Sequence, residues 1–485
     1  MQTLQTTKAA TVWSYFLNIC TIPHTSKHEQ QLTNWIINWA KEKNITYSLD
    51  DVGNLLLRKA ATPGYEQKTP TILQAHLDMV PQKNHLSDHN FLTDPIQPII
   101  KEDWMHATNT TLGADNGIGI ASCLAILEDE SIKHPPLEVL LTTDEETSMA
   151  GAFGLKAKTL QGKILINTDS EQEGSLYVGC SGSVDLNITF PSINVPTNPD
   201  KKAFEISLKG LKGGHSGRDI HLQRGNAIKL LVEVLDNLKE LPFQLSTLEG
   251  GNLRNTIPRE AHATIVCDEK LQGSLSVVIN SLHATLVDRF HNSEDSLELT
   301  IQPCALPETV LSEQCQQDFL NCLHKCENAV LAMDPDFSNV VTSSSNLGVI
   351  IQKNEAQPHF VIQFLVRSQI EHQKVLIVEQ IAEAFKRCGA KYRINGNYPS
   401  WKADLDSNIY KTVSAQYHKL FNKAPQAMII HTGLECGLFS NKYPDLSMIS
   451  FGPTIKFPHT PGEKVNIPSV DKYWQLLLAT LEAID

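Results

Sequence analysis

The sequence predicts an α/β protein in which a largely parallel sheet is covered by helices on both faces. Four short apolar runs, at 54–58, 69–80, 137–143 and 163–169, are continuous rather than alternating. Continuous apolar runs are typical of strands that are buried on both faces. A helical pattern, "NGIGIASCLAILED" at 116–129, lies between the second and third runs. Strands that alternate with helices indicate a parallel sheet.

An amphipathic helix is predicted ahead of the first strand. The segment "SKHEQQLTNWIINWAKEK" carries apolar residues at i, i+3, i+4, i+7 and i+8, counted from Leu32. Ser26 and Glu29 precede this pattern with the spacing of a capping box. We therefore expect these two side chains to cap the start of the helix.

The chain is expected to form two domains, one inserted in the other. Its 485 residues, 41% of them hydrophobic, exceed what one core usually supports. "FPSINVPTNPDKK", from about residue 190, is rich in proline and polar residues and is typical of a linker. A second such stretch, "NGNYPSWKADLD", precedes a return to the α/β pattern. These boundaries predict a discontinuous domain of residues 1–188 plus 397–485, with an inserted domain at 189–396.

The charge and the composition exclude several classes of partner. The net charge is −13 and no block is rich in Lys or Arg, which disfavours binding to nucleic acids or anionic membranes. The N-terminal residues do not resemble a signal peptide, and no apolar stretch reaches the roughly 18 residues of a membrane helix. We expect a cytoplasmic protein that acts on small molecules or peptides.

The cysteines are dispersed and suit reduced core thiols. Their closest grouping is "CLHKC", with Cys322, His324 and Cys326. Because no second Cys/His pair lies nearby, this spacing favours an ordinary helix over a metal site.

Acidic residues and one histidine gather at the ends of the apolar runs. The carboxyl ends of strands are where ligands bind in open α/β sheets, so we expect these side chains to share one site. They are His76 and Asp78 near the end of the second run, Glu145 and Glu146 just after the third, Asp169 at the end of the fourth, and Asp115 on the turn that begins the 116–129 helix.

Each of these residues also has a purely structural interpretation. Asp115 could complement a helix N-terminus, Asp169 could form a turn, and His76 could be a hydrogen-bonded core histidine. Gathered at one sheet edge, however, they need a cation for compensation. Imidazole and carboxylates without thiolate favour a catalytic zinc, manganese or cobalt site. The number of carboxylates indicates two ions and therefore hydrolytic chemistry.

Six motifs resemble those of one enzyme family. They are "HLDMV", "TLGADNGIG", "TDEE", "NTDSE", "GGHSG" and "GPTIKFPHTPGE", in that order along the whole chain. Their order is similar to that of the M20 family of co-catalytic zinc metallopeptidases, and most similar to its aminoacyl-histidine dipeptidase (Xaa-His dipeptidase, carnosinase-like) branch. The resemblance implies a di-zinc exopeptidase-like catalytic domain with a large inserted α+β, ferredoxin-like lid. It implies hydrolysis of Xaa-His dipeptides such as β-Ala-His.

The resemblance also implies roles for particular residues. Asp115 would bridge two divalent ions, most simply Zn²⁺, with Mn²⁺ or Co²⁺ as alternatives. His76 and Asp169 would be terminal ligands, and Glu146 and His459 the remaining ones. Glu145 would act as general base and take a proton from the metal-bridging water, so that hydroxide attacks the substrate, and Asp78 would fix the tautomer of His76. Without the family, His459 would be only a histidine in a loop.

Further roles follow for residues of the inserted domain and its neighbourhood. His215 in "GGHSG" would stabilise the oxyanion, although a surface histidine is the simpler interpretation of the motif alone. Asn255 and Arg367 would hold the carbonyl side and the free carboxylate of a dipeptide, whereas Arg367 could instead form a surface salt bridge. Gly433 and Glu435 would border the substrate pocket.

Several alternatives stay open at this point. The activity could be that of an M20-type deacylase or aminopeptidase on N-acyl amino acids or other short peptides. A metal-binding protein without catalysis is a further alternative. The resemblance is compatible with a homodimer formed through the lid, and Asp144 has no assigned role.

Overall fold

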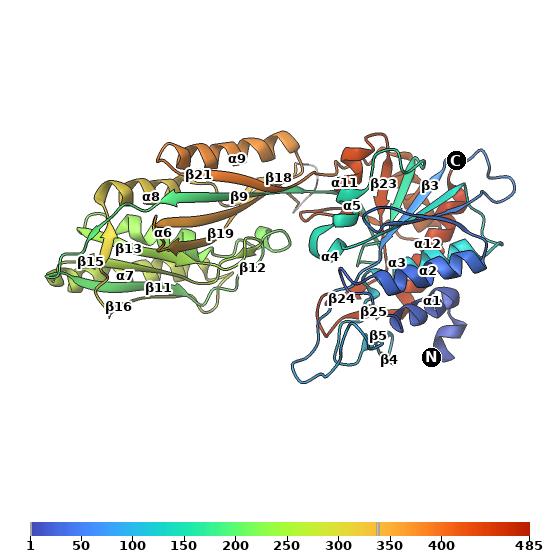
Figure 1. Cartoon of the computed structure of the whole chain (residues 1–485), viewed down its shortest axis with the longest axis horizontal. Coiled ribbons are helices and arrows are strands. Elements are labelled where there is room, and N and C mark those ends of the chain that lie inside the picture. The colour runs from blue at the N-terminus through green and yellow to red at the C-terminus, as the bar shows by residue number, and fades with distance from the viewer. Residues whose placement is uncertain (1, 336, 338–339) are drawn as a thin grey trace. The chain divides into compact units, whose positions relative to one another are not determined.

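The computed structural model describes residues 2–335, 337 and 340–485, which form two compact units (Figure 1). Unit 1 comprises the chain up to Gly179 together with Trp401–Ile429 and Leu434–Asp485, and unit 2 comprises Cys180–Ser400 and Ile430–Gly433. The chain therefore passes from unit 1 to unit 2 after Gly179, earlier than the expected boundary at 188/189. The reason is that β9 (Gly182–Pro191) pairs along its length with two strands of unit 2.

Unit 1 is built on an eight-stranded mixed sheet of order β1-β2-β6-β3-β7-β23-β8-β22. Its central strands run parallel, as predicted, whereas β2 and β8 are antiparallel to their neighbours β6 and β23. The expectation of a largely parallel sheet therefore holds for the centre and not for the edges. The strands are β1 (Thr46–Leu49), β2 (Leu55–Lys59), β6 (Leu137–Thr142), β3 (Thr71–His76), β7 (Ile164–Asn167), β23 (Ser447–Ser450), β8 (Ser175–Cys180) and β22 (Gln426–Ile430).

Every residue of β3, β6 and β7 is buried. Because successive side chains of a strand point to opposite faces, both faces of the sheet must be covered. The core that covers them includes residues of the helices α1 (Ala10–Cys20), α2 (Gln30–Glu42), α3 (Ala114–Glu128), α10 (Asn408–Phe421) and α12 (Ile467–Ala483).

A small second sheet brings the C-terminal region of unit 1 to the chain that precedes α3. Its order is β24-β25-β5-β4, and β25 is antiparallel to β5. The loop at 457–463 is therefore held near the segment that leads into α3. The strands are β24 (Ile455–Lys456), β25 (Lys464–Asn466), β5 (Trp104–Ala107) and β4 (Pro98–Lys101).

The predicted capping box at the start of α2 is wrong. The helix begins at Gln30 without a side-chain cap. The Ser26 hydroxyl donates instead to Asp78, at 2.7 Å, and the Glu29 carboxylate accepts from the backbone N–H groups of Lys27 and Asp144. Both side chains therefore bind loop residues that follow β3 and β6, rather than the N-terminus of the helix.

Unit 2 is an antiparallel sheet with helices, in agreement with the expected α+β character. Its strand order is β16-β11-β15-β13-β19-β20-β9-β21, and β18 also pairs with β19. Helices α6, α7, α8 and α9 share one hydrophobic core with this sheet. The strands are β16 (Glu298–Cys304), β11 (Lys202–Lys209), β15 (Ala261–Cys267), β13 (Phe243–Gly250), β18 (Ala329–Met333), β19 (Val341–Lys353), β20 (His359–Ser368) and β21 (Lys391–Tyr398); the helices are α6 (Ala227–Asn237), α7 (Gln272–Phe290), α8 (Glu313–Lys325) and α9 (Glu371–Lys386).

The "CLHKC" segment is helical, as predicted. Cys322 and His324 lie on α8, and Cys326 ends it. None of the side-chain groups with metal-binding geometry in the described part of the chain includes these residues. Short paired strands complete the fold, β10 (Asn194–Pro196) with β17 (Thr309–Leu311) and β12 (Gly214–His215) with β14 (Thr256–Ile257).

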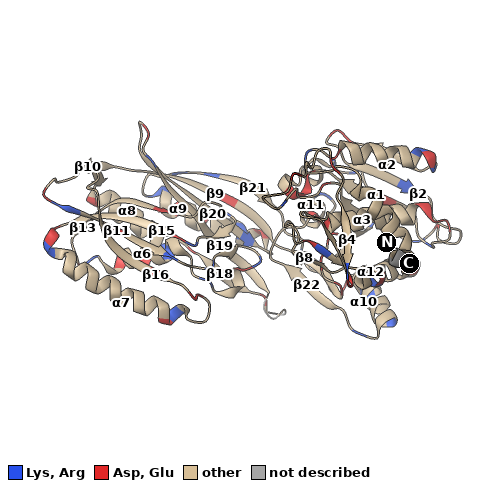
Figure 2. Ribbon diagram, turned by 90° about the horizontal axis from the view of Figure 1, so that it is seen from below, with Lys and Arg blue, Asp and Glu red and all other residues tan. Residues whose placement is uncertain are grey.

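Charged residues of both signs are spread over many elements of each unit (Figure 2). Among the helices of the described residues, none is long and apolar enough to span a membrane.

Candidate metal centre

Three adjacent parallel strands deliver side chains to one edge of the unit 1 sheet. His76 is the last residue of β3. Glu145 and Glu146 follow β6 on the short helix α4 (Glu145–Ser148), and Asp169 follows β7. Because parallel strands end at the same edge, these residues converge, as the sequence predicts.

Asp115 lies between two histidines. Its Oδ1 is 3.2 Å from His76 Nε2, and its Oδ2 is 3.3 Å from His459 Nε2. His76 Nε2 is also 3.2 Å from Asp169 Oδ1, and His459 Nε2 is 3.0 Å from Glu146 Oε2. The residues therefore form two groups with metal-binding geometry, His76–Asp115–Asp169 and Asp115–Glu146–His459. Both groups share the carboxylate of Asp115.

The electrostatics of this cluster favour added positive charge. Burial raises the pKa of Asp169 to about 8 and also raises the pKa of Glu146. Burial alone would lower the pKa of His459, but Asp115 and Glu146 outweigh this effect and raise it to about 11. Although burial opposes it, hydrogen bonding to His459 and His76 lowers the pKa of Asp115, so this carboxylate stays ionised between two histidines. Three carboxylates this close together concentrate negative charge, which divalent cations can compensate.

Glu146 gives a direct test of whether a metal fits here. Its carboxylate is largely shielded, and Oε1 is buried without a hydrogen-bond partner among the described residues. A buried carboxylate oxygen without a donor is costly unless a cation binds it. The donor set of two imidazoles and three carboxylates suits zinc, manganese or cobalt.

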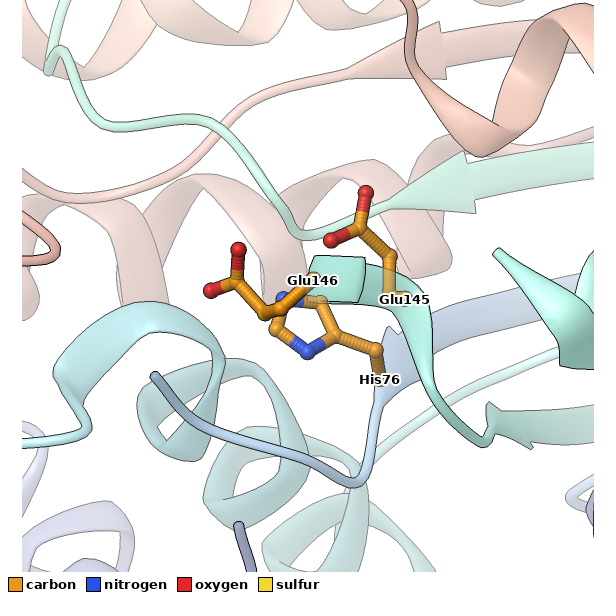
Figure 3. A group of neighbouring side chains, drawn as sticks. All are labelled: His76, Glu145 and Glu146. Carbon is orange, nitrogen blue, oxygen red and sulfur yellow. The ribbon is translucent and has the colours of Figure 1, made fainter. Parts of the chain in front are cut away.

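Glu145 and Glu146 occupy the first turn of α4 rather than a strand end, which corrects the local geometry expected from the sequence. Consecutive residues of a helix are about 100° apart, so the two carboxylates point in different directions (Figure 3). Glu145, Glu146 and His76 also form a group with metal-binding geometry. Burial, together with the nearby Asp169 and Glu146, raises the pKa of Glu145 well above its usual range.

Asp78 supports both His76 and α4. Its Oδ1 is 3.4 Å from His76 Nδ1, and its two carboxylate oxygens accept from the backbone N–H groups of Glu145 and Glu146. Although burial opposes it, hydrogen bonding to His76 lowers the pKa of Asp78 to about 2. The side chain is fully buried, so it orients these groups without being exposed itself.

Asp144 acquires a structural role. It adopts a left-handed conformation, with φ of 52°, just before α4. Its two carboxylate oxygens accept hydrogen bonds from the hydroxyls of Thr147 and Ser148. It therefore shapes the turn that presents Glu145 and Glu146.

In unit 2, His215 is prepared to donate a hydrogen bond. Its Nδ1 accepts from the N–H groups of Gly217 and Arg218, both at 3.1 Å, so a neutral ring carries its proton on Nε2. Burial and the nearby Arg367 lower the pKa of His215 to about 4, which keeps the ring neutral. His215 pairs with Thr256 across β12 and β14, which places the neighbouring Asn255 close to it.

Arg367 lies on β20 and is buried, with 7% of its surface exposed. Its Nε has no hydrogen-bond partner in the described part of the chain, and burial lowers its pKa to about 10. Asp185, whose charge acts to raise the pKa of Arg367, pairs with Arg254 at 2.6 Å. The surface salt bridge considered from the sequence is therefore absent from the described residues.

The 431–439 segment divides between the two units. Gly433 belongs to unit 2, where the Tyr398 ring packs so closely that a Cβ atom would lie 2.9 Å from it. Glu435 begins α11 (Glu435–Lys442) in unit 1 and is fully buried. Its Oε2 accepts from Gln74 and Thr142, at 2.6 and 2.8 Å, and burial raises its pKa to about 8. Glu435 thus lies within the core rather than on an exposed pocket wall.

Glu463 is a residue of the site that sequence reasoning missed. Its buried carboxylate accepts hydrogen bonds from the segment that carries Asp115. The only local signal is its place in "HTPGE", four residues after His459.

Comparison with known proteins relates the chain to one family of peptidases. Residues 72–483 match the model of peptidase family M20/M25/M40. The chain is 45% identical over 476 residues to the cytosol non-specific dipeptidase of Escherichia coli (strain K12), covering 98% of this chain and 97% of that protein. The crystal structure of aminoacylhistidine dipeptidase from Vibrio alginolyticus is 44% identical, with a TM-score of 0.91 and coverage of 99% of this chain and 98% of that one.

A tripeptidase from Staphylococcus aureus shares the fold alone, with a TM-score of 0.61, 13% identity and coverage of 97% of each chain. The family match spans most of the chain, and the two relatives cover nearly all of it. The chain therefore belongs to peptidase family M20/M25/M40.

Proposed function

We propose that this peptidase is a metal-dependent dipeptidase that hydrolyses Xaa-His dipeptides such as β-Ala-His. The observation that carries the proposal is the position of Asp115, whose two oxygens each face a different group of ligands. A shared carboxylate of this kind is the usual arrangement of two-metal hydrolases. The similarity to an aminoacylhistidine dipeptidase supports the substrate class.

His76 and Asp169 would hold one divalent ion, Glu146 and His459 the other, and Asp115 both. Zn²⁺ fits this donor set, and Mn²⁺ and Co²⁺ are the alternatives. When bound, the ions supply Lewis-acid polarisation of the scissile carbonyl and acidify the attacking water.

Glu145 acts as the general base in this proposal. It accepts a proton from the attacking water and then delivers that proton to the leaving amine. The raised pKa of Glu145 suits a group that must both take up and release a proton near neutral pH. Glu146, the next residue of α4, is assigned as a metal ligand rather than as the base, because its carboxylate lies beside His459.

The proposal also assigns roles to residues of unit 2. His215 donates its Nε2 proton to the carbonyl oxygen as negative charge develops there. Arg367 binds the free carboxylate of the dipeptide, because its buried guanidinium has an unpaired donor and no acid bonded to it among the described residues. Asn255, beside His215, assists on the carbonyl side, and Gly433 borders the substrate pocket in this proposal.

A broader dipeptidase activity is the second candidate. The relative from Escherichia coli is named a non-specific dipeptidase, which favours several dipeptides rather than Xaa-His alone. That relative's name also supports a cytosolic location for this chain.

A panel of substrates on chelator-treated protein, restored with one metal at a time, tests the proposal. We expect β-Ala-His and other Xaa-His dipeptides to be cleaved only after a divalent metal is restored. Cleavage of many dipeptides at similar rates would favour the broader activity. Preference for an N-acetyl amino acid over every dipeptide would refute the proposal.

A homodimer through unit 2 is also part of the proposal. Strand β21 is the edge of the sheet, and its Tyr392 and Ile394 are 42% and 49% exposed (Figure 1). An edge strand has unpaired backbone groups that can pair with a second copy. Light scattering should give twice the mass of one chain for the native protein and the mass of one chain for Ile394→Lys. A native mass of one chain contradicts the dimer.

A further inference from the structure

Glu463 makes an unusual set of contacts with the segment that leads into α3. Its Oε2 accepts from the N–H groups of Leu112 and Gly113, at 2.7 and 3.0 Å. Its Oε1 accepts from those of Ala114 and Asp115, at 2.8 and 3.3 Å. One carboxylate, only 2% exposed, therefore satisfies four consecutive backbone donors.

These four donors have few other partners available to them. They precede the regular part of α3, because Asp115 and Asn116 have non-helical backbone angles. Consecutive N–H groups that point inward form a concavity that binds an anion, and an ionised acceptor makes stronger hydrogen bonds than a neutral one. The carboxylate of Glu463 occupies this concavity and holds the backbone from Leu112 to Asp115.

The same carboxylate is attached to the loop of the second histidine. Glu463 lies four residues after His459, and its N–H donates to Thr460 O at 3.0 Å. The Thr460 hydroxyl in turn donates to Phe457 O at 2.8 Å. The 457–463 loop is thus closed on itself, and Glu463 is its anchor on the Asp115 segment.

We infer that Glu463 is a positioning residue, which holds Asp115 and His459 in the register that two bound cations require. The inference rests on the proposed function, since it takes these two residues as metal ligands. All four of the hydrogen bonds that its carboxylate accepts come from backbone N–H groups, so Glu463 acts through the backbone. Partners of this kind affect metal affinity by fixing the orientation of the ligands.

The test compares Glu463→Gln with a matched control, Glu138→Gln. In Glu463→Gln, the new amide would retain one acceptor oxygen and turn its NH₂ group toward N–H donors, which disrupts the concavity. Glu138 is also buried and accepts from two consecutive N–H groups, those of Gln161 and Gly162, at 2.7 and 2.9 Å. It lies near the start of β6, whereas the metal ligands follow the end of that strand. Both substitutions should lower thermal stability.

Metal-binding measurements distinguish a positioning role of Glu463 from a purely structural role. Calorimetric titration of apo protein with Zn²⁺, together with the visible spectrum of the Co²⁺ form, should show affinity reduced by about 10- to 100-fold and an altered Co²⁺ spectrum in Glu463→Gln. Glu138→Gln should bind both ions as the native protein does. If Glu463→Gln binds them within about threefold of the native affinity while its stability falls, the residue is structural only and the inference is overturned.

Two further outcomes are distinguishable. If the native protein binds fewer than two ions, the proposed metal centre fails and not the role of Glu463 alone. If Glu463→Gln does not fold, Glu463→Asp takes its place, because it keeps the charge and loses reach toward the four donors. Native metal affinity in Glu463→Asp would also overturn the inference.

Discussion

The two units bury ionisable groups with opposite consequences. At the sheet edge of unit 1, carboxylates gather around two histidines, and burial raises the pKa of Asp169 to about 8. In unit 2, His215 is half-buried and His431 and Arg367 are buried, and burial lowers their pKa values to about 4, 3 and 10. Burial disfavours the charged form in both places, and only the kind of group differs.

The proposed function assigns ligands of opposite charge to these two environments. Unit 1 concentrates carboxylates that positive ions can compensate, whereas unit 2 keeps imidazoles neutral near Arg367, whose Nε has no hydrogen-bond partner among the described residues. Metal ions suit the first environment, and the carboxylate and developing oxyanion of a peptide suit the second. The comparison can be tested by removing the charge-bearing or proton-bearing groups from each unit in turn.

The largest effect is expected in unit 1, from Glu145→Ala. Loss of a general base should lower kcat by about 10²- to 10⁴-fold. Because Glu145 is not assigned as a ligand, the variant should still bind two metals. Steady-state kinetics and metal analysis by atomic absorption measure the two quantities.

Glu146→Ala is the matched comparison, one residue along the same helix. It should lose metal as well as activity, since its carboxylate lies 3.0 Å from His459. Near-native turnover by metal-loaded Glu145→Ala would show that the base is another residue.

A smaller effect is expected in unit 2, from Arg367→Lys. A charged hydrogen bond contributes about 1.5–3 kcal/mol, so KM for a free dipeptide should rise by roughly 10- to 100-fold with little change in kcat. Lysine keeps the charge but cannot form the bidentate pair with a carboxylate. Initial rates on a dipeptide and on its C-terminal amide measure this effect.

The amide is the control in that experiment. It lacks the carboxylate, so native protein and Arg367→Lys should cleave it with similar KM values. If the variant is equally impaired on both substrates, Arg367 does not recognise the carboxylate.

The strand-end residues could be predicted because their signal is local. His76, Glu146 and Asp169 each follow an apolar run, and parallel strands bring such positions together without further information. His459 carries no local signal. It reaches the site through the pairing of β25 with β5, and only the resemblance to a family indicated it.

Other features could not be predicted because they depend on long-range contacts. Ser26 and Glu29 match a capping box by spacing, but their partners are Asp78 and Asp144, which other loops bring near. Glu463 appears in the sequence as an acid in a loop, and its four donors lie 348 to 351 residues earlier in the chain. Local patterns identify where a residue stands on its own element, but not which backbone groups another element leaves unpaired.

The smallest effect is expected from the buried imidazole of His431. Its Nδ1 is 2.8 Å from Ser181 Oγ and its Nε2 is 2.7 Å from Ser344 Oγ, so the neutral ring donates to one hydroxyl and accepts from the other. Burial, with Arg367 nearby, lowers its pKa from 6.5 to about 3. Between these pKa values the unfolded state binds a proton that the folded state does not, so stability falls as the pH falls below the unfolded value. From about pH 7 to about pH 5.5 this loss should be about 1 kcal/mol.

Urea unfolding of native protein and His431→Gln at both pH values measures this loss of stability, with the exposed His324→Gln as control. The native protein and the control should lose more stability on acidification than His431→Gln, because glutamine does not titrate; equal losses in all three would exclude His431 as the source.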